Sequence, residues 1–343
     1  MLSAIATSDW HLDKFHTAHA LRKYFPDRQD IDLQFAEIEK PFEYAVENGI
    51  DNIFVLGDLG ENHVLSAEAK VGLLTLLFKY DGVLNIHIIL GNHDVSDIRT
   101  NSLALVKLLT EHEKFETVHL YAKQKRVSIG EVEINMMPFP HTRPSTRGVA
   151  INLAHVEALN AVRDNGNKIT KGGIDFGSDP DWYWISGHLH TYQKFKRGVF
   201  CGAPYQCTFG ENLPCGFLHI KAKTVGEEIR VKTKFINSNP AFTLNNFEVN
   251  GRADWDELET DPLTFYKIHV AEGVVVPEDI RTRYPNIVDI VGDKKHTEQI
   301  VTEMCDMPVL DFNTGLEDFL NRDLEPEQVK RGLELVKEAS TEC

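Results

Sequence analysis

Four short motifs in the chain carry side chains that commonly bind metal ions. Imidazole and carboxylate groups together suit manganese, iron or zinc better than calcium or magnesium alone. A carboxylate has two oxygens, so one aspartate can bridge two cations, and two cations roughly 3.5–4 Å apart can clamp a phosphodiester and activate water. These residue types therefore predict a two-metal centre suited to phosphodiester hydrolysis. In chain order, the motifs are Asp9-Trp10-His11, Gly57-Asp58, Gly91-Asn92-His93-Asp94 and Gly187-His188-Leu189-His190.

Each motif alone has an ordinary alternative explanation, because a D-x-H or G-D sequence often occurs by chance. The G-N-H-D and G-H-x-H motifs are rarer. All four occur here, and each one follows a predicted strand. The carboxyl ends of neighbouring parallel strands bring ligands to one edge of a sheet, so the four motifs can converge.

The elements that must position the first three motifs form an alternating pattern of strands and helices. Short apolar runs end directly before each motif, and helical patterns separate them. Such alternation is typical of βαβ units with parallel strands. The predicted elements are strands at 2–7, 52–56 and 85–90, and helices capped by Asp30 or Asp32 and by Ser66.

The chain after about residue 118 becomes rich in short strands. A series of α/β units followed by a β-rich half predicts an α/β fold in which two sheets pack together with helices outside. The predicted strands lie at 118–122, 126–129, 132–138, 150–154, 182–186, 199–201, 216–222 and 229–235.

The composition is that of a globular protein. The 343 residues predict about two domains, and 42% hydrophobic with 26% charged residues argue against a wholly disordered chain. No apolar run approaches the roughly 20 residues that a membrane helix needs, so no membrane association is expected. The N-terminus has no basic region typical of a secretory signal. Five cysteines without a C-x-x-C pair argue against a disulfide framework, so we expect a reducing, cytoplasmic location.

The acidic residues are concentrated near the C-terminus. The whole chain has a formal net charge of −16. Residues 241–343 contain 10 Lys and Arg and 23 Asp and Glu, whereas residues 1–240 contain 26 and 29. The overall charge therefore says little about nucleic-acid binding by the first 240 residues, because the local field matters. Ser238-Asn239-Pro240 is a plausible linker between the two parts.

The four motifs resemble the signature of calcineurin-like metallophosphoesterases. The segment 202–211, GAPYQCTFGE, followed by Gly216-Phe217, is similar to a segment of the SbcD/Mre-type nuclease subunits of DNA recombination and repair, including phage-encoded ones. The resemblance covers residues 1 to about 235. It implies a four-layer α/β/β/α sandwich over 1–237, a smaller C-terminal α+β capping domain that selects DNA over 241–311, and partner-binding helices over 312–343.

The resemblance also implies a role for each residue of the motifs. His93 would act as an acid or stabilise the phosphate, and Asp94 would orient its ring. His155 is preferred over His141 as the remaining histidine ligand, because His155 ends a predicted strand whereas prolines flank His141. By resemblance, Asp9, His11 and His190 hold the first metal, Asn92, His155 and His188 hold the second, and Asp58 bridges them.

The implied activity is Mn²⁺-dependent hydrolysis of DNA, with Mg²⁺ as the other possible metal, by a 3′-to-5′ exonuclease and single-strand endonuclease. The implied partners are DNA, a coiled-coil ATPase of the SbcC/Rad type and a second copy of the chain, in a bacterial or phage-infected cytoplasm. By resemblance, His63 would take the role of a family histidine that guides DNA ends, with an exposed loop histidine as an equal alternative. Arg143 and Lys194 are candidate phosphate contacts.

Two other functions share these motifs. A metallophosphoesterase for small phosphodiesters or phosphoproteins would have the same metal site, but the segment 202–211 argues against it. A non-catalytic scaffold on this fold would be expected to lose ligands, and every expected ligand type is present.

Overall fold

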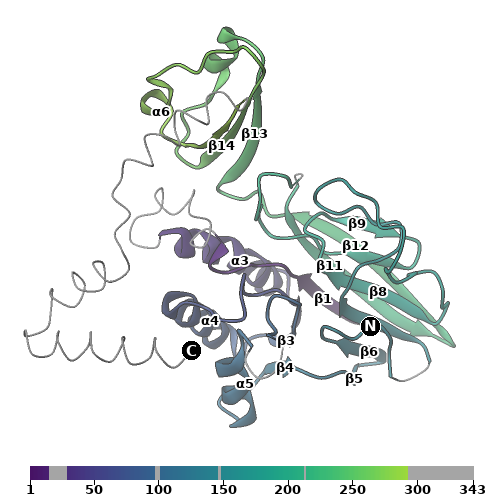
Figure 1. Ribbon diagram of the computed structural model, residues 1–343. Helices are drawn as coiled ribbons and strands as arrows, with labels where there is room; N and C mark the ends of the chain where they lie inside the picture. Colours follow the sequence, from purple (N-terminus) through teal and green to yellow (C-terminus); the bar gives the residue numbers. More distant parts are fainter. Residues whose placement is uncertain (15–28, 97–100, 146–147, 212–213, 293–343) are drawn as a thin grey trace, which may run out of the picture. The chain divides into compact units, whose positions relative to one another are not determined.

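The computed structural model describes residues 1–14, 29–96, 101–145, 148–211 and 214–292 (Figure 1). The predicted partner-binding helices at 312–343 lie outside the described residues, as does the end of the predicted capping domain. No helix within the described part of the chain is both long and apolar enough to cross a membrane.

The first sheet is mixed and carries the first three motifs. Its strand order is β12-β11-β1-β2-β3-β4. The pairs β1–β2, β2–β3 and β3–β4 are parallel, whereas β11 pairs with β1 and β12 in antiparallel fashion. The strands are β1 (Leu2–Thr7), β2 (Asn52–Leu56), β3 (Asn85–Ile89), β4 (Val118–Tyr121), β11 (Gly216–Val225) and β12 (Glu228–Asn237).

The second sheet carries the last motif. Its order is β5-β6-β7-β8-β10-β9, with parallel pairs from β6 to β10 and antiparallel pairs at both edges. The strands are β5 (Lys125–Ile129), β6 (Val132–Met137), β7 (Ala150–His155), β8 (Trp182–Gly187), β9 (Gln193–Phe195) and β10 (Gly198–Phe200).

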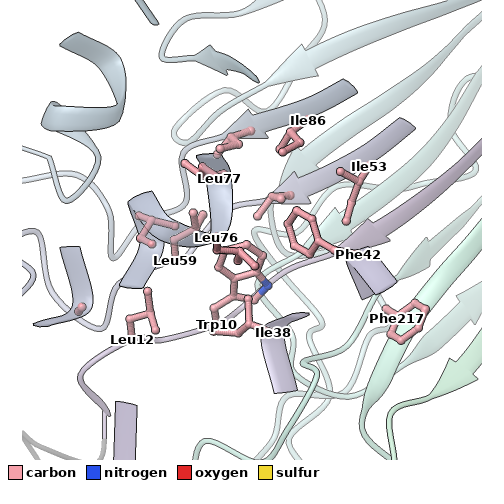
Figure 2. Close-up of a cluster of buried hydrophobic side chains, with 14 of the residues drawn as sticks. Trp10, Leu12, Ile38, Phe42, Ile53, Leu59, Leu76, Leu77, Ile86 and Phe217 are labelled. Atoms are coloured by element: carbon pink, nitrogen blue, oxygen red, sulfur yellow. The ribbon is translucent and has the colours of Figure 1, made fainter. Parts of the chain in front are cut away.

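Most of these strands contribute side chains to two separate cores, because successive residues of a strand point to opposite faces. Ile53 and Val55 of β2 pack under the helices, whereas Phe54 and Leu56 pack against the second sheet. The helices of the first core are α3 (Gln29–Glu47), α4 (Ala67–Tyr80) and α5 (Ala104–Glu111). Figure 2 shows Trp10 buried within this core. The burial of Trp10 anchors the first motif, whose other two residues are metal-ligand candidates. The two sheets therefore form the expected sandwich.

The face of the second sheet that points away from the first is covered differently from the prediction. Trp184 of β8 and Phe200 of β10 pack there against Phe176 and Ile169. These two residues come from segment 156–181, all of which is described and which contains no helix. Its many Gly, Asn and Asp residues favour turns over helix. Among the described residues, this face is therefore covered by irregular chain, where helices were expected.

A third sheet follows the linker and has its own small core. Its three strands are all parallel in the order β13-β14-β15, and Trp255, Ile268 and Ile287 are buried in its core. Its elements are β13 (Thr243–Val249), the 3₁₀ helix η2 (Arg252–Glu257), β14 (Thr264–Val270), α6 (Ile280–Arg283) and β15 (Ile287–Val291).

Candidate metal centre

The motif residues lie at the carboxyl ends of strands from both sheets. Parallel strands β1, β2 and β3 end directly before the first three motifs. In the second sheet β7 ends at His155 and β8 ends at Gly187, one residue before His188. The glycine at position 57 permits the close approach of these ends, because a Cβ there would lie 2.6 Å from the His155 Nδ1 atom. Two sheets packed face to face thus bring distant segments to one place.

His11 and His190 form the first part of this centre. Their Nε2 atoms lie 3.0 Å apart. The Nδ1 atom of His11 is 2.8 Å from Glu61, and that of His190 is 2.7 Å from Glu211. An ionised carboxylate only accepts hydrogen bonds, so each Nδ1 carries a proton and the two Nε2 atoms are left facing each other. Two ring nitrogens this close need a proton or a metal ion between them.

Asp9 completes this first group. Its carboxylate, together with His11 and His190, offers three ligand atoms within 4.8 Å of one another. Asp9 is fully buried, and it accepts hydrogen bonds from the Ser8 hydroxyl at 2.6 Å and the His188 backbone N–H at 3.0 Å. Two nitrogens and a carboxylate that converge in this way suit a divalent metal ion.

A second group of ligand atoms meets around His155. The His155 Nδ1 atom donates to the Leu56 carbonyl at 2.8 Å, which turns its Nε2 toward Asp58 Oδ2 at 3.1 Å. The Asn92 Oδ1 atom lies 3.0 Å from that Nε2 and 2.8 Å from the Nδ1 of His188. This is a second convergence of donors on one point.

Asp58 lies between the two groups. Its Oδ2 atom is 3.1 Å from His155 and 3.9 Å from the Nε2 of His11. The seven predicted ligands are therefore brought together, with Asp58 where a bridging carboxylate would stand. The donor set fits two divalent cations.

Burial and nearby carboxylates shift the pKa values of the histidines in opposite directions. Burial lowers the pKa of His190, but the hydrogen-bonded Glu211 more than offsets this and raises the pKa to about 10. Burial likewise lowers the pKa of His155, while Asp58 raises it to about 9. Burial raises the pKa of Asp58, but His155 holds it well below the ordinary value. The centre thus has a negative potential that favours a positive charge at both positions.

Several ligand residues have left-handed backbone conformations. The φ angles of Asp9, His11, Asp58 and His188 are 57°, 43°, 53° and 87°. For residues other than glycine this region costs about 1–2 kcal/mol each. Such strain persists where the surroundings over-determine the conformation, and it is common at functional sites.

The expected role of Asp94 in orienting the His93 ring is wrong. The His93 Nδ1 atom donates to the Glu61 carbonyl at 2.8 Å. The Asp94 carboxylate instead accepts hydrogen bonds from backbone N–H groups in the loops after β2 and β3. Adjacent residues in a tight turn point in different directions, so Asp94 fastens the two loops together while His93 faces the centre. The donors to Asp94 are Asp58 N at 2.8 Å, Leu59 N at 3.1 Å, Gly60 N at 3.2 Å, Gly91 N at 2.9 Å and Ser102 Oγ at 2.7 Å.

Glu61 and Glu211 are the functional residues that the sequence analysis missed. Burial raises the pKa of Glu61, but His11 and Lys14 more than offset this and lower it to about 2. Lys14 lies 2.6 Å from Glu61, and the Cys207 N–H donates to Glu211 at 2.7 Å. Both carboxylates are therefore fixed where they set the orientation of a ligand histidine. The only sequence signal was their place inside the G-D-L-G-E and F-G-E segments.

The segment 202–211 surrounds the first group. The Tyr205 hydroxyl donates to the Trp10 carbonyl, inside the first motif. Gln206 donates to the carbonyls of Glu211 and Leu244, each at 3.1 Å, and accepts from the Leu244 N–H at 2.9 Å. This segment therefore joins the metal centre to β13 of the third sheet.

The remaining predicted residues lie outside the two groups. Of the two histidine alternatives, His155 is in the centre and His141 is exposed in a loop. His63, Arg143 and Lys194 are exposed as well. A cavity of about 350 Å³ opens beside the centre and is lined by residues that include His190, Arg163 and Glu211. It gives a ligand access to the first group.

Comparison with known proteins places these observations in a family. A family model described as calcineurin-like phosphoesterase matches residues 2–192, more than half of the chain. No curated protein matches the chain. Among solved structures, the chain is similar to GAP50, the anchor in the inner membrane complex of Plasmodium, at 10% identity over 69% of this chain and 85% of that one, with a TM-score of 0.39. It is also similar to the calcineurin-like phosphoesterase YfkN from Bacillus subtilis at 11% identity over 71% and 93%, with a TM-score of 0.35.

Proposed function

The chain belongs to the calcineurin-like phosphoesterase family, and from this premise we propose that it is the Mn²⁺-dependent DNA nuclease subunit of an SbcCD/Mre-Rad-like complex. Metal-dependent hydrolysis of phosphoester bonds is the activity of the family. The proposal adds DNA as the substrate, 3′-to-5′ exonuclease and single-strand endonuclease activity, and a role in recombination and repair.

The observation that carries the hydrolase part is the convergence of ligand atoms. The Nε2 atoms of His11 and His190 face each other because Glu61 and Glu211 hold the opposite ring nitrogens. Two divalent ions bound here would polarise the phosphoryl group, activate water and stabilise the leaving oxygen. Mn²⁺ suits the mixed imidazole, amide and carboxylate ligands, and Mg²⁺ is the alternative.

His93 is the residue best placed to handle a proton. Its backbone N–H donates to Asp58 at 2.8 Å, and its Nδ1–H donates to the Glu61 carbonyl. With Nδ1 as the donor, Nε2 is the ring nitrogen that takes or releases a proton. The His93 ring lies 4.8 Å from that of His11, so this nitrogen is close to the first group. His93 thus protonates the leaving oxygen or donates a hydrogen bond to the phosphate.

The DNA part is supported by the segment 202–211. Its sequence is similar to that of SbcD-type subunits. Its side chains join the first motif to β13, through Tyr205 and Gln206. A nuclease that reads its substrate with a second domain needs such a link between the metal centre and the substrate-selecting part. The third sheet is the proposed beginning of that capping domain.

The experiment uses the purified chain with Mn²⁺, end-labelled linear DNA and bis-p-nitrophenyl phosphate as a small diester. We expect cleavage of both, and loss of both in Asp58→Ala together with loss of bound metal in elemental analysis. Glu228→Ala, at an exposed position of β12, is the control. Cleavage of the small diester alone would favour a small-molecule phosphodiesterase and overturn the nuclease proposal.

The proposed partners are a coiled-coil ATPase of the SbcC/Rad type and a second copy of the chain, in a bacterial or phage-infected cytoplasm. Residues 312–343, which contain two apolar patterns at helical spacing, are the proposed ATPase-binding segment. Deletion of 312–343 should abolish copurification with the ATPase while Mn²⁺-dependent hydrolysis of the small diester remains. Unchanged copurification would remove the docking proposal.

A further inference from the structure

A basic groove lies along the edge of the sandwich, separate from the metal centre. β4 is the edge strand of the first sheet and β5 is the edge strand of the second, and residues 122–124 connect them. The groove has a volume of about 530 Å³ and is lined by α5, β4 and this connection. Its lining includes Lys107, Lys123, Lys125 and Tyr121, and Glu111 is the one acidic residue among the described residues that line it.

The charge of this groove contrasts with the charge of the chain. The whole protein carries a net charge of −16, yet three lysines line this groove against one glutamate. Lys123 and Lys125 are exposed. Lys107 lies 3.7 Å from Glu111, at a distance where an exposed ion pair is weak. The positive potential is therefore local and faces solvent, where it attracts a polyanion.

The groove also offers an aromatic surface beside these charges. Tyr121 is half-buried, and the Lys125 ammonium lies 6.0 Å from its ring centroid. The His87 Nδ1 atom lies 3.1 Å from the Tyr121 hydroxyl, which fixes the ring. Positive charge that tracks a backbone, together with a fixed aromatic ring on which a base stacks, is the combination that binds single-stranded nucleic acid.

The groove begins at the same edge of the sheet as the metal centre. β1 to β4 are parallel, so the end of β4 lies on the same edge as Asp58, two strands away. At strand spacings of about 4.8 Å, that separation is about 10 Å. Gln124 donates to the Arg143 carbonyl at 2.7 Å, which places a further basic residue beside the entrance. A strand whose phosphate is held at the centre can therefore continue into the groove.

We infer that this groove, lined by Lys107, Lys123, Lys125 and Tyr121, binds the single-stranded part of a nucleic acid whose scissile phosphate lies at the metal centre. The inference rests on the proposed nuclease function for the identity of the substrate. The groove itself is tested by binding without metal, so the two ideas fail separately.

The test measures the affinity of a fluorescent 12-nucleotide oligo-dT for the full chain in chelator, by anisotropy at several salt concentrations. Lys123→Ala/Lys125→Ala should weaken binding roughly tenfold and lower the salt slope by about 1.4, since each phosphate contact on a single strand contributes about 0.7. The matched control is Lys168→Ala/Lys171→Ala, which removes two exposed lysines from the irregular segment over the second sheet. Thr110→Trp, which fills the groove without changing charge, should weaken binding with the slope retained.

Absent binding by the wild-type chain, or wild-type affinity and slope in Lys123→Ala/Lys125→Ala, would overturn the groove assignment. An equal loss for blunt duplex DNA would overturn the preference for single strands. If Lys123→Ala/Lys125→Ala keeps its affinity for DNA but no longer binds the ATPase, the groove binds protein and the nucleic-acid assignment is wrong. DNA cleavage with Mn²⁺ is measured separately. If the protein does not cleave DNA but the lysine substitutions weaken binding, only the nuclease proposal is wrong. If the protein cleaves DNA but the lysine substitutions leave binding unchanged, only the groove assignment is wrong.

Discussion

Replacement of Asp94 by asparagine tests the idea that this buried carboxylate holds the loops of the metal centre in place. Asp94 is fully buried and receives five hydrogen bonds, four from backbone N–H groups and one from Ser102. Burial and the neighbouring Asp58 raise its pKa above the ordinary value, and the hydrogen bonds offset this only in part. Because every partner is a donor, the ionised carboxylate is the form that accepts all five hydrogen bonds.

The expected loss in the free energy of unfolding follows from how the five donors are divided between the two carboxylate oxygens of Asp94. Oδ2 accepts from Asp58 and Gly91, and Oδ1 accepts from Leu59, Gly60 and Ser102. Asparagine has one oxygen, so its NH₂ group must face at least two N–H donors. A buried donor without a partner costs about 1–3 kcal/mol, which gives a loss of about 2–6 kcal/mol in the free energy of unfolding. Typical domains have only about 5–15 kcal/mol in total.

The assays are urea unfolding of the chelator-treated protein and, on a separate folded sample incubated with Mn²⁺, metal analysis. We expect Asp94→Asn to lower the midpoint and to reduce metal occupancy, because the Asp58 loop loses its anchor. Asp51→Asn, at an exposed position just before β2, should change the free energy of unfolding by less than about 0.5 kcal/mol. A loss below 1 kcal/mol for Asp94→Asn, or unchanged metal occupancy, would refute the anchoring role.

Three further predictions concern single side chains. Burial, reinforced by His119, lowers the pKa of His87 to about 4. His87 therefore stabilises the fold less as the pH falls from about 6.5 to 4, at roughly 1.4 kcal/mol per pH unit, and His87→Phe should flatten that part of a stability–pH curve measured by urea unfolding. Glu211→Gln should weaken Mn²⁺ binding about 10–100-fold in titration calorimetry, because His190 loses the partner that orients it; equal affinity would contradict this role. His93→Ala should lower the rate of small-diester hydrolysis about 10²–10⁴-fold with metal content unchanged, and normal turnover would exclude His93 from proton transfer.

The strands that end at the motifs were predictable because their signals are local. Leu2–Thr7 and Asn52–Leu56 are mostly apolar, buried runs that stop at polar or glycine residues. Ser66 caps α4 as expected and accepts from the Ala69 N–H at 3.1 Å. The strands β9 and β13 and the helix α5 were missed. β9 has three residues, too few to show a period, β13 is interrupted by Asn245 and Asn246, and α5 begins after Leu103, which provides no side-chain cap.

The finer arrangement of the centre was not predictable from local patterns. Glu61 and Glu211 act through contacts with residues 50 and 21 positions away in the chain, and their place beside the G-D and F-G segments does not reveal those contacts. The role given to Asp94 was wrong because sequence adjacency to His93 does not fix where a side chain points. Side chains that bind backbone N–H groups of another loop leave no pattern in the sequence.

Gln206 has a consequence for how the chain responds to its ligands. Its amide is bonded in both directions to Leu244 of β13 and also to the carbonyl of Glu211, whose carboxylate orients His190. A displacement of β13 therefore pulls on the loop that sets the geometry of the first cation position. Energetic linkage of this kind is reciprocal. Cation binding at His190 therefore stabilises the position of β13 by the same free energy by which a fixed β13 favours cation binding.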